Sequence, residues 1–111
     1  GVLVENSGEY IGKLWGTTES LNNNKNYIND LYNTGKVRII LTTSRKSKYK
    51  LETIKQLKDL DIRYHQIIFD LPHCQRILVN DFSQTNSYPT AKAINVPRDS
   101  DNIEQYIQEN F

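Results

Sequence analysis

Two short, uninterrupted apolar runs constrain this chain more than any other feature: Val37–Thr43 and Arg76–Asn80. Both are rich in β-branched residues, and neither alternates between apolar and polar positions. Such runs are typical of strands that lie in a parallel sheet and are covered on both faces. Two further strands are expected over Tyr64–Phe69 and Ala91–Val96.

Helical patterns lie before, between and after these strands, over Ser20–Asn33, Ser47–Leu60 and Asp101–Glu109. Gly35 is expected to stop the first helix and Ser100 or Asp99 to cap the third. The inner face of the second helix is expected to carry Leu51, Ile54 and Leu57. The order of elements predicts one α/β domain of three-layer, Rossmann-like build, with a mostly parallel sheet and right-handed crossovers.

Residues 5–19 fit neither the helical nor the strand period. Gly8, Gly12 and Gly16 punctuate them, which predicts a hairpin or short mobile flap with Trp15 partly exposed.

Composition excludes several classes of protein. A length of 111 residues suits a single domain. A net charge of +1 argues against a nucleic-acid-binding or membrane-surface protein. There is neither an apolar run long enough to span a bilayer nor a signal-peptide pattern. The lone Cys74 suits the reducing cytoplasm. It is expected to be structural rather than a nucleophile paired with His73.

Ligands of open parallel sheets bind beyond the carboxyl ends of the strands. The first long run ends in Thr42-Thr43-Ser44-Arg45, where hydroxyls and backbone N–H groups before a helix can bind a phosphate oxygen. Ordinary helix capping by Thr43 or Ser44 explains the same residue types equally well. The second run ends in Asn80-Asp81, which is either a Mg²⁺ site or a turn.

Basic and histidine side chains near these ends are the remaining candidates. Arg45, Lys46, Lys48 and Lys50 form either a solvated face or, through Arg45 and Lys46, a contact to an anionic substrate. His65 lies inside a predicted strand and is expected to be structural. His73 lies in a loop near the predicted site and is the better functional candidate.

Taken together, the motifs resemble the haloacid dehalogenase-like (HAD) phosphatase superfamily. The resemblance covers nearly the whole chain, and the order and spacing of the motifs carry it. It is strongest to small, capless members found with genes for capsular and surface polysaccharides. The segments involved are Ile39–Arg45, Tyr64–Ile68, Leu71–His73, Ile77–Asp81 and Tyr88–Val96.

The resemblance implies roles for individual residues. In the superfamily an Asp-x-Asp motif supplies the nucleophile and the general acid/base, and Gly1–Asn6 resembles the stretch that directly follows it. Thr43 matches the residue that binds the phosphoryl group, with Arg45 just after it. The basic residue that steadies the phosphoryl-enzyme is matched by Arg76, with Lys46 as the second candidate.

The metal motif is matched by Asn80-Asp81, in which one acid is replaced by an amide, so Asp81 is the expected Mg²⁺ ligand. The Asp-x-Asp and its strand, which is central in the superfamily, are not in this chain. Because the chain lacks an initial Met, we expect them to precede Gly1 in the native protein.

The resemblance therefore implies a cytoplasmic, Mg²⁺-dependent phosphomonoester hydrolase of the phosphoaspartyl type. Its expected substrate is a small phosphorylated metabolite, such as a sugar phosphate in surface-polysaccharide synthesis. The alternative is a catalytically silent binding or interaction module of the same fold, which the amide of Asn80 and the weak third motif favour.

Overall fold

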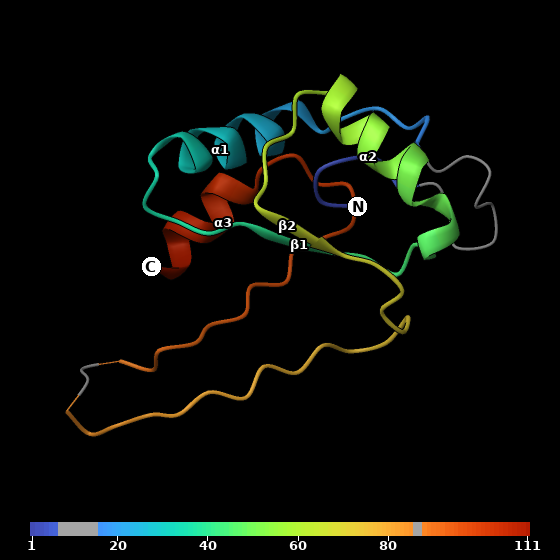
Figure 1. The fold of residues 1–111 in the computed structure, drawn as a ribbon. Helices are drawn as coiled ribbons and strands as arrows, with labels where there is room; N and C mark the ends of the chain where they lie inside the picture. Colours follow the sequence, from blue (N-terminus) through green and yellow to red (C-terminus); the bar gives the residue numbers. More distant parts are fainter. Residues whose placement is uncertain (7–15, 86–87) are drawn as a thin grey trace.

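The computed structural model describes residues 1–6, 16–85 and 88–111. The described residues form three α-helices and two β-strands, so the α/β class expected from the sequence is confirmed. Figure 1 shows how these elements are arranged. In chain order the elements are α1 (Asn22–Asn33), β1 (Ile40–Thr42), the short 3-10 helix η2 (Ser47–Tyr49), α2 (Lys50–Asp59), β2 (Gln66–Ile68) and α3 (Ile103–Asn110).

The two strands form a parallel sheet with a register of Ile40 opposite Gln66 and Thr42 opposite Ile68. Both strands are shorter than the apolar runs that predicted them. The backbone pairing nevertheless continues past β1, because the Thr43 N–H donates to the Ile68 carbonyl at 3.0 Å and the Leu71 N–H to the Thr43 carbonyl at 3.1 Å. The chain crosses from β1 to β2 through η2 and α2, as a parallel pair requires.

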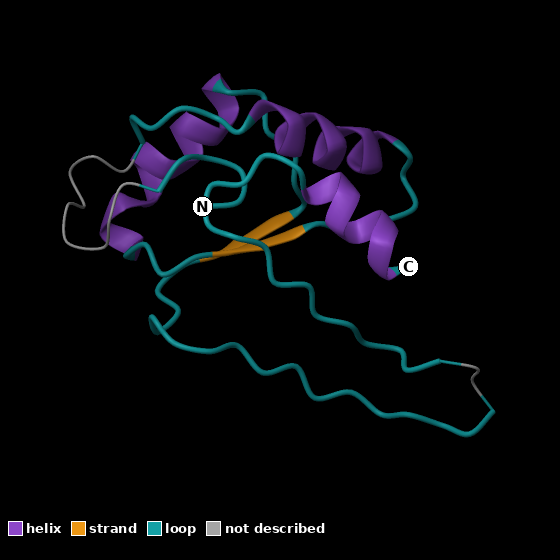
Figure 2. Cartoon of the chain, turned by 180° about the vertical axis from the view of Figure 1, so that it is seen from behind, coloured by secondary structure: helices purple, strands orange, loops and turns teal. Residues whose placement is uncertain are grey.

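The helices gather on one side of the strands, and α1 packs against α3 (Figures 1 and 2). In both views the N-terminus lies between the helices and the sheet. The buried apolar side chains among the described residues are Leu21, Leu57, Ile62 and Ile103. None of the helices in the described ranges is long and apolar enough to cross a membrane.

The first turns of α1 and α3 cap one another. The Asp101 carboxylate accepts hydrogen bonds from the backbone N–H groups of Asn23 (3.2 Å) and Asn24 (2.9 Å) at the start of α1. In return, the Asn24 side-chain oxygen accepts the Ile103 N–H at the start of α3, at 3.0 Å. The prediction that Ser100 or Asp99 caps the last helix is therefore wrong, because the cap comes from another helix. At the other end of α1, Gly35 adopts a φ of 68° and stops the helix as predicted.

The predicted strands Arg76–Asn80 and Ala91–Val96 are absent. Both lie in an extended excursion, residues 72–96, which we call the arm; its described residues contain neither helix nor strand (Figure 1). Ile77, Leu78 and Val79 are 80%, 75% and 89% exposed. A strand needs a neighbour for its N–H and C=O groups, and the two-stranded sheet does not extend to the arm.

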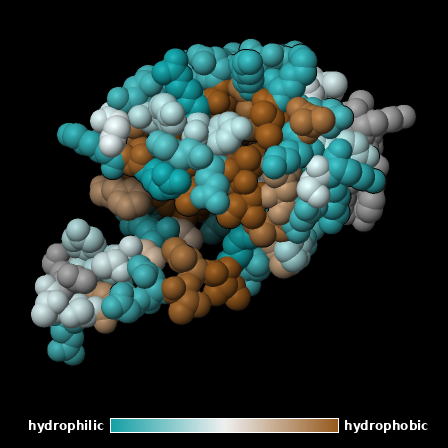
Figure 3. Space-filling model, in the orientation of Figure 1, coloured by the Kyte–Doolittle hydropathy of each residue, from teal (hydrophilic) through white to brown (hydrophobic). Residues whose placement is uncertain are grey.

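The arm also explains the elongated shape. The radius of gyration is 15.2 Å, against roughly 13 Å for a compact domain of this length. Figure 3 shows an apolar cluster on the arm, which juts out from the remainder of the molecule. Its two limbs are joined near Thr90, whose hydroxyl accepts a hydrogen bond from the Asn80 amide (2.7 Å) and donates one to the Asp81 carbonyl (3.0 Å).

The inner face of α2 differs from the prediction. Leu51 is 81% exposed, whereas Thr53, Gln56 and Leu57 are buried. The helical period therefore placed Leu57 correctly and Leu51 wrongly. Two polar side chains face inward because the Arg45 guanidinium lies against them, as described below.

The predicted flap is described only at its base. Val4 and Ser20 form an antiparallel bridge, and the Glu5 N–H donates to the Glu19 carbonyl at 2.9 Å. Residues 7–15 lie outside the described residues, and with them the prediction for Trp15.

Candidate functional site

A cavity of about 790 Å³ opens beside β1, between the strand and the N-terminal segment Gly1–Asn6. Its volume is within the range of sites for small molecules. The walls come from five parts of the chain: the N-terminal segment, β1 with the turn after it, α2, Ile67 of β2, and single residues at the start of the arm and just after it. Its charged or titratable side chains are those of Glu5, Arg45, His73, Arg76 and Arg98.

Thr43 and Ser44 line the cavity where β1 ends. The Thr43 hydroxyl oxygen accepts the Arg45 N–H at 3.1 Å, so its hydrogen remains available to donate. Neither residue caps a helix: the Ser47 N–H at the start of η2 donates instead to the Asp70 carboxylate, at 2.8 Å. This hydrogen bond is the main cause that lowers the pKa of Asp70. Hydroxyls, rather than the end of a helix, therefore face the cavity.

Arg76 and His73 reach the same end of the cavity from the start of the arm. One guanidinium nitrogen of Arg76 donates to the Cys74 carbonyl at 2.7 Å, and the other to the Ser44 hydroxyl at 3.3 Å. Arg76 is thus tied to the turn after β1, although the segment that carries it is no strand. The structure brings together Thr43, His73 and Arg76, three of the residues singled out in the sequence.

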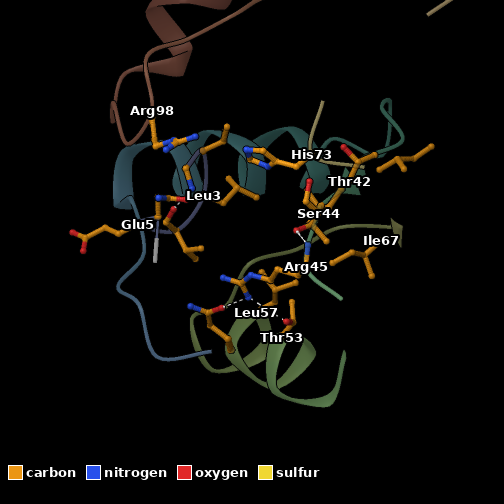
Figure 4. A pocket seen from close by; sticks show the side chains of 18 of the residues that line it. Leu3, Glu5, Thr42, Ser44, Arg45, Thr53, Leu57, Ile67, His73 and Arg98 are labelled. Carbon is orange, nitrogen blue, oxygen red and sulfur yellow. Dashed lines mark hydrogen bonds between the residues drawn. The ribbon is translucent and has the colours of Figure 1, made fainter. Parts of the chain in front are cut away.

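Arg45 lies deeper, against α2. One of its nitrogens donates to the Thr53 hydroxyl (3.2 Å) and to the Gln56 side-chain oxygen (2.9 Å), which Figure 4 marks as dashed lines. Burial lowers the pKa of the Arg45 guanidinium, which nevertheless stays protonated. Burial also lowers the pKa of the Gly1 amino group, an effect that the Asp99 carboxylate partly opposes. Arg45 therefore supplies positive charge to the cavity floor while it fastens β1 to α2.

Arg98 lines the cavity on another side, and the sequence reading overlooked it. In Figure 4 it lies across the cavity from Thr42 and Ser44, with its guanidinium turned inward. Its side chain forms no hydrogen bond or ion pair with the residues that the structure describes. The sequence held a signal for Arg98, because it stands two positions after the apolar run Ala91–Val96 and ligands of parallel sheets bind just beyond the ends of such runs.

Lys46, Asn80 and Asp81 are outside the cavity lining. Lys46 is exposed, and Asn80 is engaged with Thr90 in the arm. Within the described residues, no group of three or more His, Cys, Asp or Glu side chains is placed to hold a metal. Asp81 is the single acid of the predicted metal pair, so the residues described here do not fit a Mg²⁺ site as they lie. We derive no chemical step through a metal.

Positive charge is concentrated in the walls of the cavity. Three arginines and one glutamate contribute to its walls, whereas the chain carries a net charge of only +1. Figure 4 shows the Glu5 carboxylate pointing away from the other side chains of the cavity. Guanidinium and hydroxyl groups are donors without a competing acid, an arrangement suited to a phosphate or carboxylate.

His65 and Cys74 lie outside the cavity lining. The His65 Nδ1 accepts the Ile39 N–H at 2.9 Å, and its ring stacks on Tyr32 with 4.6 Å between centroids. This agrees with the structural role expected for His65. Cys74 is a free, exposed thiol.

Comparisons with known proteins returned no match to a family model, a curated protein or a solved structure.

Proposed function

We propose that this chain forms the phosphate-binding part of a HAD-like phosphomonoester hydrolase that acts on a small phosphorylated metabolite. The observation that carries the proposal is the meeting of Thr43, Ser44 and Arg76 at one end of the cavity. The sequence resemblance selected two of these residues, Thr43 and Arg76, from segments more than thirty positions apart. Their convergence with a third donor supports the resemblance.

The chemistry proposed for the site follows from its donors. Thr43 and Ser44 hydroxyls donate to oxygens of the phosphoryl group, and Arg76 balances the charge that these oxygens carry in the transition state. In the phosphoaspartyl route, an aspartate oxygen bonds to phosphorus while the bond to the substrate alkoxide breaks and the alkoxide takes a proton. Water then hydrolyses the acyl phosphate, which releases inorganic phosphate and restores the aspartate. We place that aspartate upstream of Gly1, as the resemblance implies.

We also propose a larger, three-layer Rossmann-like sheet for the full-length protein. Two features support it. Ile39 and Thr43 direct their backbone groups toward β2, so Ile40 and Thr42 direct theirs to the opposite edge, beside the cavity. The arm presents an exposed apolar run, Ile77–Val79, that suits a buried strand. In the full-length gene product, slow hydrogen exchange of the Ile77–Val79 amides would support this sheet, and fast exchange would contradict it.

Mg²⁺ dependence belongs to the same proposal and rests on the resemblance, which assigns the metal to Asp81. Because Asp81 lies outside the cavity lining here, this part of the proposal requires the larger sheet to bring Asp81 to the site. A cytoplasmic location is proposed as well, because an exposed free thiol at Cys74 persists in a reducing compartment. The competing function is a silent binding module. Two observations favour it: among the described residues, Glu5 supplies the single carboxylate of the cavity lining, and Asp81 lies outside that lining.

The test is phosphate release from a panel of sugar phosphates by the full-length gene product, with Mg²⁺ and with a chelator. We expect activity only with Mg²⁺. Thr43→Val and Arg76→Gln are each expected to lower kcat about 100-fold, the scale for losing one donor to transition-state charge. Asp81→Asn is expected to remove most of the metal-dependent activity. Cys74→Ser and Arg38→Gln, which alter residues outside the cavity, are the controls.

Two results would separate the candidate functions. A protein that is inactive across the panel but binds inorganic phosphate, with Arg76→Gln weakening the binding, is the silent module. A protein that neither hydrolyses the panel nor binds phosphate refutes both.

A further inference from the structure

Hydrogen bonds fix the turn that carries Arg98 on its side of the cavity. Arg98 occupies a β-turn over residues 97–100, which is closed by the Ser100 N–H donating to the Pro97 carbonyl at 3.2 Å. Asp99, the next residue of the turn, has a φ of 62°. Aspartate enters this left-handed region more readily than most residues other than glycine, and hydrogen bonds on both sides fix Asp99 in it.

The surroundings of the turn do hold it. The Asp99 N–H donates to the Gly1 carbonyl at 2.8 Å, and its carboxylate accepts the Asn6 N–H at 2.9 Å. On the other side, the Ser100 carbonyl accepts from the buried Asn24 amide at 2.7 Å. The turn is thus bound to both ends of the N-terminal segment and to α1, which leaves the backbone under Arg98 little freedom.

Arg98 differs from the two other arginines of the cavity in one respect. Arg45 is bonded to α2, and Arg76 to the turn after β1. The Arg98 guanidinium has no hydrogen-bond or ion-pair partner among the described residues, although hydrogen bonds of Asp99 and Ser100 fix the turn that carries it. A positioned cation without a protein partner, turned into a cavity, suits an anionic group of a ligand.

We propose that the cavity takes a small phosphorylated acid: the phosphoryl group binds at Thr43, Ser44 and Arg76, and a carboxylate at the far end of the same molecule binds Arg98. This rests on the proposed function, since it assumes the phosphate at the end of β1. The cavity, of about 790 Å³, has the size of a small-molecule site, and Arg98 lines it together with Thr43, Ser44 and Arg76. Arg98 is then the residue that selects acidic over neutral sugar phosphates.

The experiment compares three probes by calorimetry on the full-length gene product, with chelator present so that no hydrolysis occurs. Inorganic phosphate probes the phosphate end alone. Phosphogluconate and sorbitol phosphate are matched open-chain ligands that differ in a terminal carboxylate against a hydroxymethyl group. We expect phosphogluconate to bind about tenfold more tightly than sorbitol phosphate, the scale of one charge-assisted contact.

Arg98→Gln is expected to abolish this preference while the affinity for inorganic phosphate stays unchanged. Arg98→Lys keeps the charge and is expected to retain most of the preference. Arg38→Gln, an exposed arginine outside the cavity, is the matched control and is expected to change neither. Because Arg98 is exposed, the Arg98 variants are expected to have the same melting temperature as the wild type. Thermal unfolding of the samples used for calorimetry tests this expectation.

The outcomes are distinguishable. An equal preference in wild type and Arg98→Gln, or no preference in the wild type, overturns the inference. If inorganic phosphate still binds and Arg76→Gln weakens it, the phosphate site itself stands. If no probe binds at all, the phosphate site and the carboxylate site fall together.

Discussion

Asn24 is the residue whose replacement we expect to cost most stability for its size. It is fully buried in the first turn of α1. Its amide nitrogen donates to the carbonyls of Val2 and Ser100, each at 2.7 Å, and its oxygen accepts the Ile103 N–H at 3.0 Å. One side chain therefore joins the N-terminal wall of the cavity, the turn that carries Arg98 and the start of α3.

Asn24→Ala removes all three hydrogen bonds and leaves their backbone partners without a replacement. At about 1 kcal/mol for each net hydrogen bond, the loss is about 3 kcal/mol. Alanine returns about 0.5 kcal/mol through its higher helix propensity. The expected net loss, about 2.5 kcal/mol, is a large part of the 5 to 15 kcal/mol that ordinarily stabilises a domain.

The measurement is urea unfolding followed by circular dichroism, with Asn26→Ala as the control. Asn26 is an exposed residue of the same helix, so its replacement reports the propensity gain alone. We expect the two variants to differ by about 3 kcal/mol, which is about 1 to 3 M in the urea midpoint. Asn24→Asp keeps the acceptor but loses both donors, and is expected to be no more stable than Asn24→Ala. A difference below about 0.5 kcal/mol between the Asn24→Ala and Asn26→Ala variants would refute the role assigned to Asn24.

Two further predictions concern the loops around the sheet. The Ser47 N–H holds the pKa of Asp70 below its unfolded value, so this carboxylate stabilises the fold above its unfolded pKa, near 4. That stability is lost as pH falls through the lower folded pKa. Asp70→Asn is therefore expected to make the free energy of unfolding depend less on pH in this acidic range. An unchanged pH dependence would count against the hydrogen bond between the Ser47 N–H and the Asp70 carboxylate. Gly16 has a φ of 104°, and a Cβ there would lie 3.1 Å from the Glu52 carbonyl oxygen. Gly16→Ala is therefore expected to cost about 1 to 2 kcal/mol, and more than Gly35→Ala, where φ is also positive but nothing lies within 4 Å. Equal thermal melting of the two glycine variants would show that the contact with Glu52 is unimportant.

The sequence was most informative where local chemistry decides the structure. The helical periods and Gly35 predicted α1 to within two residues at its start, because a glycine with positive φ ends a helix whatever surrounds it. The continuous apolar run that ends at Thr43 predicted β1, and the segment Tyr64–Phe69 predicted its parallel partner β2. The polar residues directly after β1, Thr43 and Ser44, were likewise found at a cavity, since the carboxyl end of a strand is where side chains and loops meet.

The sequence failed where a residue depends on distant partners. Ile77–Val79 has the composition of a buried strand but is exposed, because composition gives no information on whether a neighbouring strand is present to accept its hydrogen bonds. Leu51 has the period of a core residue, yet the polar Thr53 and Gln56 are buried instead, because Arg45 arrives from the end of β1 to bond them. No local sequence pattern predicts this contact between Arg45 and the inner face of α2.

The reciprocal caps of α1 and α3 and the inward position of Arg98 are likewise decided by tertiary structure alone. Asp101 and Asn24 are 77 positions apart. Asp101, just before α3, accepts backbone N–H groups at the start of α1, and Asn24, in the first turn of α1, accepts the N–H group at the start of α3. The sequence by itself determined which segments are helical, where β1 runs and which residue types stand at its end. Only the folded chain decided which of those residues share a cavity, because long-range hydrogen bonds, rather than local preference, position the turns that carry them.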